Sequence, residues 1–175
     1  NIVLADVAKT ELFSLWQQAK TAGLATPNIG TINDMICCPG GDYCSLANAK
    51  SIPVAEAIQR KFDDLDYVYD LGDITLNISG CMNACGHHHV GHIGILGVDK
   101  KGEEWYQIQL GGSAGKNAAL GNVLGPSLSR GAVVDSIEAI LDVYVENRLL
   151  EESFLSTYQR IGQAKFKERV YATVT

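Results

Sequence analysis

Apolar side chains recur along the chain at two spacings, which together predict a mixture of strands and helices. Strict alternation of apolar and other residues predicts strands at 74–78, 93–95 and 105–110. Residues 99–102, Asp-Lys-Lys-Gly, predict a hairpin turn between the last two of these strands. The first seven residues are apolar enough to predict one further, buried strand at 1–7.

Apolar residues at helical spacing predict two helices in the first half of the chain. Thr10 can cap a helix whose apolar positions follow at i, i+4 and i+7, and Gly23 is expected to end it. A second apolar helical face begins at 46–49 and continues to Phe62. Ser51 and Pro53 predict a kink or a fresh helix start within this stretch.

The sequence also predicts two irregular loops and a helical C-terminal end. Glycine, proline, asparagine and aspartate are frequent at 26–43, and glycine is frequent at 111–125, so both segments are expected to be irregular loops. Two helical stretches follow at about 131–149 and 152–170. The pattern therefore predicts an α/β (α+β) fold, with a mixed sheet, flanking helices and a C-terminal helical cap.

Composition and charge exclude several classes of protein. The 175 residues are 46% hydrophobic and 19% charged, which excludes collagen-like, coiled-coil and disordered chains. The net charge of −6 argues against nucleic acid or an anionic membrane as a partner. We find no apolar run of transmembrane length and no signal peptide, so we expect a soluble, cytoplasmic protein. Because the chain starts without Met, directly on a predicted strand, we expect an N-terminal part of the same protein to be missing.

Candidate chemistry is concentrated in the cysteines, which all lie in two short glycine-rich loops. The five are Cys37, Cys38, Cys44, Cys81 and Cys85. Free cysteines are often buried as small apolar residues, and this is the plainer explanation. The clustering of the cysteines beside glycines favours ligation of an inorganic group instead, because a glycine backbone can approach such a group and direct N–H groups at its sulfurs. An odd count and an intracellular composition argue against disulfides.

The cysteine spacing narrows the choice of metal. Five residues separate Cys38 from Cys44 and three separate Cys81 from Cys85, whereas zinc fingers and ribbons favour shorter spacings. The sequence lacks the C-x-x-C-H of a c-type haem, and His88 stands where a radical enzyme using S-adenosylmethionine would need its third cysteine. Four soft thiolates from two loops suit a cubane iron–sulfur cluster. A stand-alone iron–sulfur electron-transfer domain and a structural zinc module remain alternatives.

The motifs themselves resemble those of a known family. The chain contains Cys38-x5-Cys44 followed by Ser-Leu-Ala, then Gly80-Cys-x-Asn-x-Cys-Gly86, then His92-Ile-Gly-Ile-Leu-Gly97. In order and spacing this resembles the sirohaem and 4Fe-4S signature of the sulfite/nitrite reductase haemoprotein family. Residues 1 to about 125 are similar to the later part of such proteins, and the C-terminal helices fit more loosely.

The resemblance implies a ligand set and a reaction. Cys38, Cys44, Cys81 and Cys85 would hold the 4Fe-4S cluster, and the Cys85 thiolate would also ligate the sirohaem iron, which makes Cys85 the expected catalytic residue. The substrate would be sulfite or nitrite, reduced by six electrons to sulfide or ammonia. The electron donor would be a ferredoxin or a flavoprotein. We expect Cys37 to have a packing role, although spacing alone also allows it to pair with Cys44.

Three further residues are candidate cofactor contacts. Asn83 matches a family position close to the sirohaem, although an asparagine there also suits a tight turn. His87 follows the cluster motif directly and is either a cofactor contact or a solvated histidine. Lys116, in a glycine-rich loop that lacks the P-loop pattern, could bind a sirohaem carboxylate or belong to a plain connection.

The resemblance also implies that this chain is incomplete. We expect 1–25 to be the end of a preceding ferredoxin-like half-domain, 26–130 to be the 4Fe-4S and sirohaem-binding domain, and 131–175 to be a C-terminal helical extension. Residues 62–99 contain no Lys or Arg, yet reduction of sulfite or nitrite needs cations that bind the anion and donate protons. The family carries those cations mainly in its earlier part. We therefore expect this chain to be inactive alone, and either cofactor can be absent from it.

Overall fold

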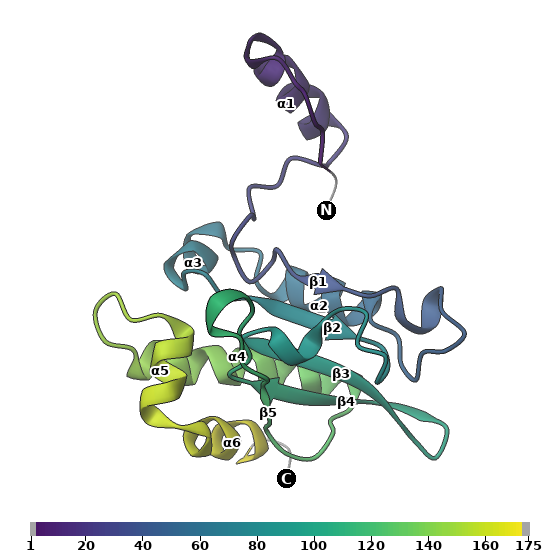
Figure 1. Cartoon of the computed structure of the whole chain (residues 1–175), viewed down its shortest axis with the longest axis vertical. Helices are drawn as coiled ribbons and strands as arrows, with labels where there is room; N and C mark the ends of the chain where they lie inside the picture. Colours follow the sequence, from purple (N-terminus) through teal and green to yellow (C-terminus); the bar gives the residue numbers. More distant parts are fainter. Residues whose placement is uncertain (1–2, 173–175) are drawn as a thin grey trace.

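The computed structural model describes residues 3–172, and its centre is a mixed five-stranded sheet (Figure 1). The strands follow the sheet in sequence order: β1 (Ile36–Cys37), β2 (Leu76–Ser79), β3 (Ile93–Lys100), β4 (Glu103–Leu110) and β5 (Asn122–Val123). The pairs β1–β2 and β2–β3 are parallel, whereas β3–β4 and β4–β5 are antiparallel. This confirms the predicted α/β (α+β) class and its mixed sheet.

Helices flank the sheet, and those of the second half form the predicted cap. The helices are α1 (Leu12–Thr21), α2 (Ile52–Lys61), α3 (Leu65–Asp70), α4 (Arg130–Asn147), α5 (Phe154–Ile161) and α6 (Gln163–Ala172). Short 3-10 turns are η1 (Lys9–Glu11), η2 (Gly40–Asp42), η3 (His88–Val90) and η4 (Gly115–Asn117). The long helix α4 packs against β4, α2, α5 and α6, so it joins the sheet to the C-terminal helices (Figure 1).

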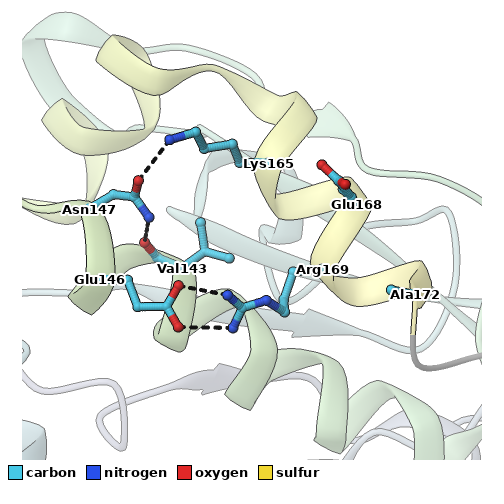
Figure 2. A pocket seen from close by; sticks show the side chains of 7 residues that line it. All are labelled: Val143, Glu146, Asn147, Lys165, Glu168, Arg169 and Ala172. Carbon is cyan, nitrogen blue, oxygen red and sulfur yellow. Dashed lines mark hydrogen bonds and ion pairs between the residues drawn. The ribbon is translucent and has the colours of Figure 1, made fainter.

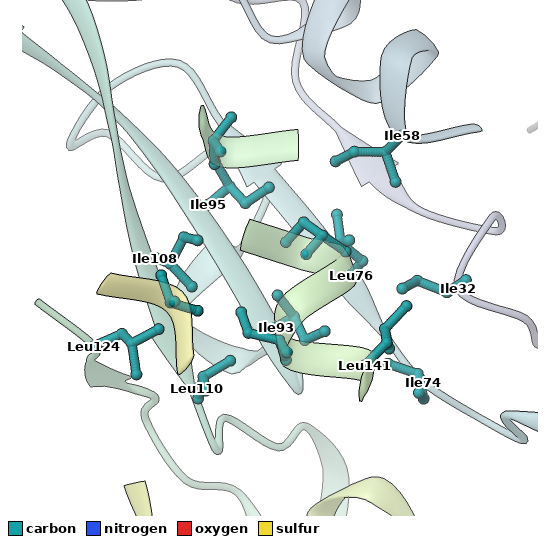
Figure 3. Packing of buried hydrophobic residues seen from close by; sticks show 14 of the residues in the cluster. Ile32, Ile58, Ile74, Leu76, Ile93, Ile95, Ile108, Leu110, Leu124 and Leu141 are labelled. Atoms are coloured by element: carbon teal, nitrogen blue, oxygen red, sulfur yellow. The ribbon is translucent and has the colours of Figure 1, made fainter. Parts of the chain in front are cut away.

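The core lies between the sheet and these helices. Ile93 and Ile95 of β3 and Ile108 of β4 are fully buried, and Leu141 of α4 packs into the same cluster (Figure 3). Ile58 brings α2 into this core as well. Each fully buried aliphatic side chain contributes about 1.5–3 kcal/mol. Leu76 and Ile78 of β2 belong to the same core, which therefore fixes the strand that leads to Cys81.

The predicted hairpin is confirmed in detail. Strand β3 ends at Lys100 and β4 begins at Glu103, and these two residues are cross-strand partners. Between them Lys101 and Gly102 have positive φ angles of 58° and 83°. Two successive left-handed residues give a type I′ turn, which matches the twist of the strands that it joins.

The prediction of a buried strand at 1–7 is wrong for the residues that the structure describes. Residues 1–2 lie outside them, and 3–7 form no strand, with Val3 and Leu4 exposed. An apolar run becomes a strand only when an adjacent strand pairs with its backbone, and here no pairing of 3–7 is found.

Helix α1 exists where predicted, but its details differ. Thr10 lies inside the preceding 3-10 turn and does not cap α1. The apolar face is exposed at Leu12, Phe13 and Trp16, and the helix stands apart from the sheet (Figure 1). Gly23 has a left-handed φ of 71° just beyond the helix end, as predicted.

Other element boundaries are corrected by local backbone conformation. The helix predicted over 152–170 is two helices, because Gly162 with φ of 75° separates α5 from α6. Residues 46–49 form a turn and a bend and no helix, and the fresh start at Ser51 is the true beginning of α2. Helix α3 and strand β1 were not predicted; the carboxylate of Asp64 caps α3 by accepting two backbone N–H groups.

The described helices include none that is both long enough and apolar enough to cross a membrane. The division of the chain at 25 and 130 stays a prediction.

His92 connects the starts of two strands to the helical cap. Its Nδ1 accepts a hydrogen bond from the backbone N–H of Thr75 at 3.2 Å, and its ring stacks on Phe154 of α5 with 6.4 Å between ring centroids. Burial lowers the pKa of His92 below 6.5, and the opposing charge of Asp73 only partly offsets this. The folded state therefore holds His92 in its neutral form.

We expect the free energy of unfolding to fall as the pH is lowered below 6.5. Because the pKa of His92 is lower in the folded than in the unfolded chain, its contribution is complete above the unfolded pKa and is lost as pH falls through the folded one. Urea unfolding at a series of pH values measures this. His92→Gln should flatten the pH dependence in that window, and His87→Gln, at an exposed site, should not. Identical slopes for the two variants would contradict this role of His92.

Candidate metal centre

The four cysteines expected to bind a metal are brought to one edge of the sheet by parallel strands. Cys38 directly follows β1, and Cys81 lies just beyond the end of β2. Because β1 and β2 are parallel neighbours, their carboxyl ends meet at the same edge. The backbone N–H of Cys38 donates to the carbonyl of Ile78 at 3.0 Å, which fixes the two ends together. Cys44 follows η2, and Cys85 lies in the turn after β2.

A small cavity of about 80 Å³ lies between these two loops. Its lining residues are Cys38, Pro39, Gly40, Cys44, Leu46, Ala47, Gly80, Cys81, Asn83 and Cys85. The structure thus brings together all four predicted ligands, although 36 residues of chain lie between Cys44 and Cys81 along the sequence. Cys81 is buried, Cys38 and Cys44 are half-buried, and Cys85 is exposed at the rim.

The fifth cysteine, Cys37, does not line this cavity. Its side chain packs against the hydrophobic core, and its thiol donates to the carbonyl of Cys38 at 3.3 Å. Successive residues of an extended strand point to opposite faces, so Cys37 and Cys38 diverge. Burial, with a smaller effect of the neighbouring Cys38, raises the pKa of Cys37 to about 12. This environment suits the packing role expected for Cys37.

Glycine allows the two loops to meet. A Cβ atom on Gly80 would lie 2.7 Å from the carbonyl oxygen of Ala49 and 2.9 Å from the Cα of Gly40, so no other residue fits there. The Gly80 carbonyl accepts hydrogen bonds from Asn48 and Ala49 at 2.8 and 3.0 Å. The backbone N–H of Gly80 donates to the sulfur of Cys38 at 3.0 Å. One residue of the second loop is therefore bonded to three residues of the first.

The loop from Cys81 to Gly86 is held in a compact and strained shape. The N–H of Ala84 donates to the carbonyl of Cys81 at 3.2 Å, and the N–H of Gly86 donates to the hydroxyl of Ser79 at 3.1 Å. Ala84 and His87 have left-handed φ angles of 56° and 52°, which are uncommon for residues with a side chain. Such strain persists only where surrounding contacts enforce it, and it is frequent at functional sites.

The donor set fits an iron–sulfur cluster better than a single ion. Zinc draws all its sulfur ligands to about 2.3 Å from one point, whereas a cubane carries each thiolate on a different corner. Four thiols around a cavity, with an N–H already directed at one sulfur, are instead what a cluster requires. Cys38, Cys44, Cys81 and Cys85 are the residues that would hold it.

The three predicted cofactor contacts lie at different distances from this cavity. Asn83 lines it and is exposed, and His87 is exposed two residues beyond Cys85. Lys116 is exposed in η4 and does not line the cavity. Its loop is nevertheless bonded to the histidine segment, because Gly121 donates its N–H to the carbonyl of His89 at 2.8 Å. Their roles toward a cofactor stay predictions.

The sequence does not indicate the environments of two residues in this region. Ser51, at the start of α2, places its hydroxyl 3.5 Å from the sulfur of Cys38. His88 is buried, and its Nδ1 has no hydrogen-bond partner among the described residues. Burial lowers the pKa of His88, with a smaller effect of His89 in the same direction. A serine before a helix is usually taken as its cap, so no sequence signal indicated that Ser51 contacts a cysteine.

A larger groove between α4 and α6 is separate from this site (Figure 2). It has a volume of about 460 Å³. Its charged groups are largely paired with one another: Arg169 with Glu146 at 2.6 Å, and Lys165 with the side-chain oxygen of Asn147 at 2.9 Å. It contains none of the cysteines, so candidate redox chemistry remains at the sheet edge.

Comparison with solved structures identifies the class of fold. The structure of the NirA protein of Mycobacterium tuberculosis superposes with a TM-score of 0.75 at 24% sequence identity, over 92% of this chain and 31% of that one. At this identity the likeness concerns the fold alone.

Comparison of sequences then identifies the family. The family described as nitrite and sulphite reductase 4Fe-4S domain matches residues 30–174, which is most of the chain. The chain belongs to this family, as its cysteine motifs indicated.

Curated relatives include both kinds of reductase. The chain is 27% identical over 173 residues to sulfite reductase [ferredoxin] 2 of Mycolicibacterium paratuberculosis, covering 93% of this chain and 31% of the relative. It is 28% identical over 115 residues to a ferredoxin–nitrite reductase of Leptolyngbya laminosa, covering 63% of this chain and 21% of the relative. The chain thus spans less than a third of either protein.

We expect Gly86→Ala to destabilise the fold and to disturb the cysteine site. A Cβ atom there would collide with the carbonyl of Ile78, the same group that accepts the hydrogen bond from Cys38. Overpacking of this kind costs about 1–3 kcal/mol, measurable by urea unfolding. Gly131→Ala is the matched control, because nothing lies within 4 Å of its added Cβ. That change in a helix should be neutral or stabilise by up to about 1 kcal/mol. Equal stability of the two variants would rule out the close packing described.

Proposed function

We propose that this chain supplies the 4Fe-4S ligands of a sirohaem-dependent sulfite or nitrite reductase. Cys38, Cys44, Cys81 and Cys85 hold the cluster in this proposal. The observation that carries it is the single cavity lined by four thiols from two loops far apart in the sequence. Membership of the nitrite and sulphite reductase 4Fe-4S domain family supports it independently.

Cys85 is proposed to have a second role, as the thiolate shared with the sirohaem iron. Of the four cysteines it is the exposed one, so its sulfur can be approached from outside the cavity while the buried Cys81 cannot. A sulfur that serves two groups must be accessible on two sides. When bound, the cluster and the sirohaem would supply the single-electron transfers needed to reduce sulfite to sulfide or nitrite to ammonia.

The chain's own polar residues support binding rather than proton supply. Asn83 at the cavity rim can donate its amide N–H, and Lys116 is an exposed cation in a loop bonded to the histidine segment. Residues 62–99 contain no Lys or Arg to bind an anionic substrate. We therefore propose that substrate cations come from another part of a longer protein, as the partial coverage of the relatives supports.

Substrate and donor are proposed at the level of class. Relatives act on sulfite and on nitrite according to their names, so either oxyanion is a substrate candidate. Both of those names specify ferredoxin, which makes a ferredoxin the first candidate donor, and a flavoprotein the second. A cytoplasmic location stays a prediction from composition.

Substitution of two adjacent cysteines, Cys37 and Cys38, tests which of them is a cluster ligand. Cys38→Ala should reduce the iron content of the reconstituted complete protein from about four atoms per chain to about none, because the cubane loses one of its four thiolates. Cys37→Ala should retain the iron, since Cys37 packs into the core and does not line the cavity. Iron and acid-labile sulfide analysis measures both. The reverse pattern would transfer the ligand role to Cys37.

The shared role of Cys85 is tested in the complete enzyme. Cys85→Ser should abolish reduction of sulfite or nitrite, because a hydroxyl is a poor ligand for soft iron centres. Met82→Leu is the matched control, since Met82 is exposed in the same loop and should retain turnover. Assays with reduced ferredoxin or a chemical reductant, together with visible spectra of sirohaem, measure the effect. Retained turnover in Cys85→Ser contradicts the proposal.

A further inference from the structure

Ser51 occupies the N-cap position of α2, but its side chain does not cap the helix. Ser51 is completely buried, and its hydroxyl makes no hydrogen bond to the backbone of the first turn of α2. Instead the hydroxyl oxygen lies 3.5 Å from the sulfur of Cys38. A buried hydroxyl that leaves water needs a partner, and the partner available here is a predicted cluster ligand.

Two other serines in the chain show what capping looks like. Ser129 and Ser153 start α4 and α5 with extended backbones, at ψ of 165° and 158°, and their hydroxyls accept N–H groups from Ala132 and Ser156. Ser51 has a helical backbone instead, with φ of −97° and ψ of −42°. This conformation turns its hydroxyl away from the helix end and toward Cys38.

The surroundings of Ser51 hold the hydroxyl in this place. A Cβ on Gly40 would lie 2.7 Å from the hydroxyl oxygen of Ser51, and a Cβ on Gly80 would lie 3.0 Å from it. The two glycines therefore leave space for this hydroxyl between the cysteine loops. The N–H of Gly80 reaches the same sulfur at 3.0 Å. Among the four cavity cysteines, Cys38 is the one whose sulfur has hydrogen-bond partners within the described residues.

We propose that Ser51 donates a hydrogen bond to the Cys38 thiolate and thereby raises the reduction potential of the 4Fe-4S cluster. A ligating thiolate carries no proton, so the hydroxyl must be the donor of this pair. Reduction adds negative charge that is shared with the ligand sulfurs, and a donor directed at sulfur stabilises that charge. Ser51 is thus a tuning residue that acts on the cluster through the ligand Cys38. The inference rests on the proposed cluster.

The test compares midpoint potentials of cluster-loaded complete proteins by redox titration followed with EPR. Ser51→Ala should lower the ratio of reduced to oxidised cluster at a fixed potential about tenfold, which for one electron is about 59 mV. Ser51→Thr keeps a hydroxyl and should restore most of the wild-type value. Ser136→Ala is the control, because it removes a hydroxyl that is also buried but is bonded to the Ala132 carbonyl in α4. It should leave the potential unchanged.

Each outcome separates this inference from the proposed function. A wild-type protein that binds no iron ends the proposed function and the inference together. A loaded Ser51→Ala protein with the wild-type potential ends the inference alone. If both Ser51 variants fail to bind iron while Ser136→Ala binds it, Ser51 only shapes the loop, and the tuning role is overturned.

Discussion

The contact between Gly80 and the first cysteine loop is the constraint on which the site depends. Through one residue, the second loop accepts hydrogen bonds from Asn48 and Ala49 and donates one to the sulfur of Cys38. These bonds require two backbones to approach more closely than any side chain permits. The sheet supports the contact, because β1 and β2 are parallel neighbours and their carboxyl ends bring both loops to one edge of the sheet. A methyl group at this point would separate the cysteines that form the site.

The same arrangement gives the four sulfurs unequal environments. Cys81 is buried and the Cys38 sulfur has two hydrogen-bond partners, whereas Cys85 is exposed. A cluster held here would be bonded most firmly on its inner side and accessible on its outer one. This polarity agrees with a centre that takes up electrons and passes them to a second group at Cys85. Ser51 lies beside Cys38, which is half-buried, and not in the turn that carries Cys85.

Much of the fold could be predicted because its signals are local. Alternation located β2, β3 and β4, and the cysteine spacing with its glycines indicated the two loops that meet. Residues 3–7 were misassigned because an apolar run contains no information about whether a pairing strand is present. Gly162 interrupts a continuous helical pattern, and a single glycine inside such a pattern is ambiguous without the tertiary structure. The sequence predicts only a helix start at Ser51. Its contact with Cys38, 13 residues earlier, depends on the backbone angles of Ser51, which the sequence does not reveal.

The sequence separation between the two cysteine loops has a consequence for biogenesis. Cys38 and Gly80 are 42 residues apart, and α2, α3 and β2 lie between them. Closing a loop of this length costs entropy, which the packing of the intervening elements offsets. The polypeptide must therefore acquire most of its tertiary structure before four thiols face one another. A cluster held here would then be completed late in folding, with the exposed Cys85 as its accessible side.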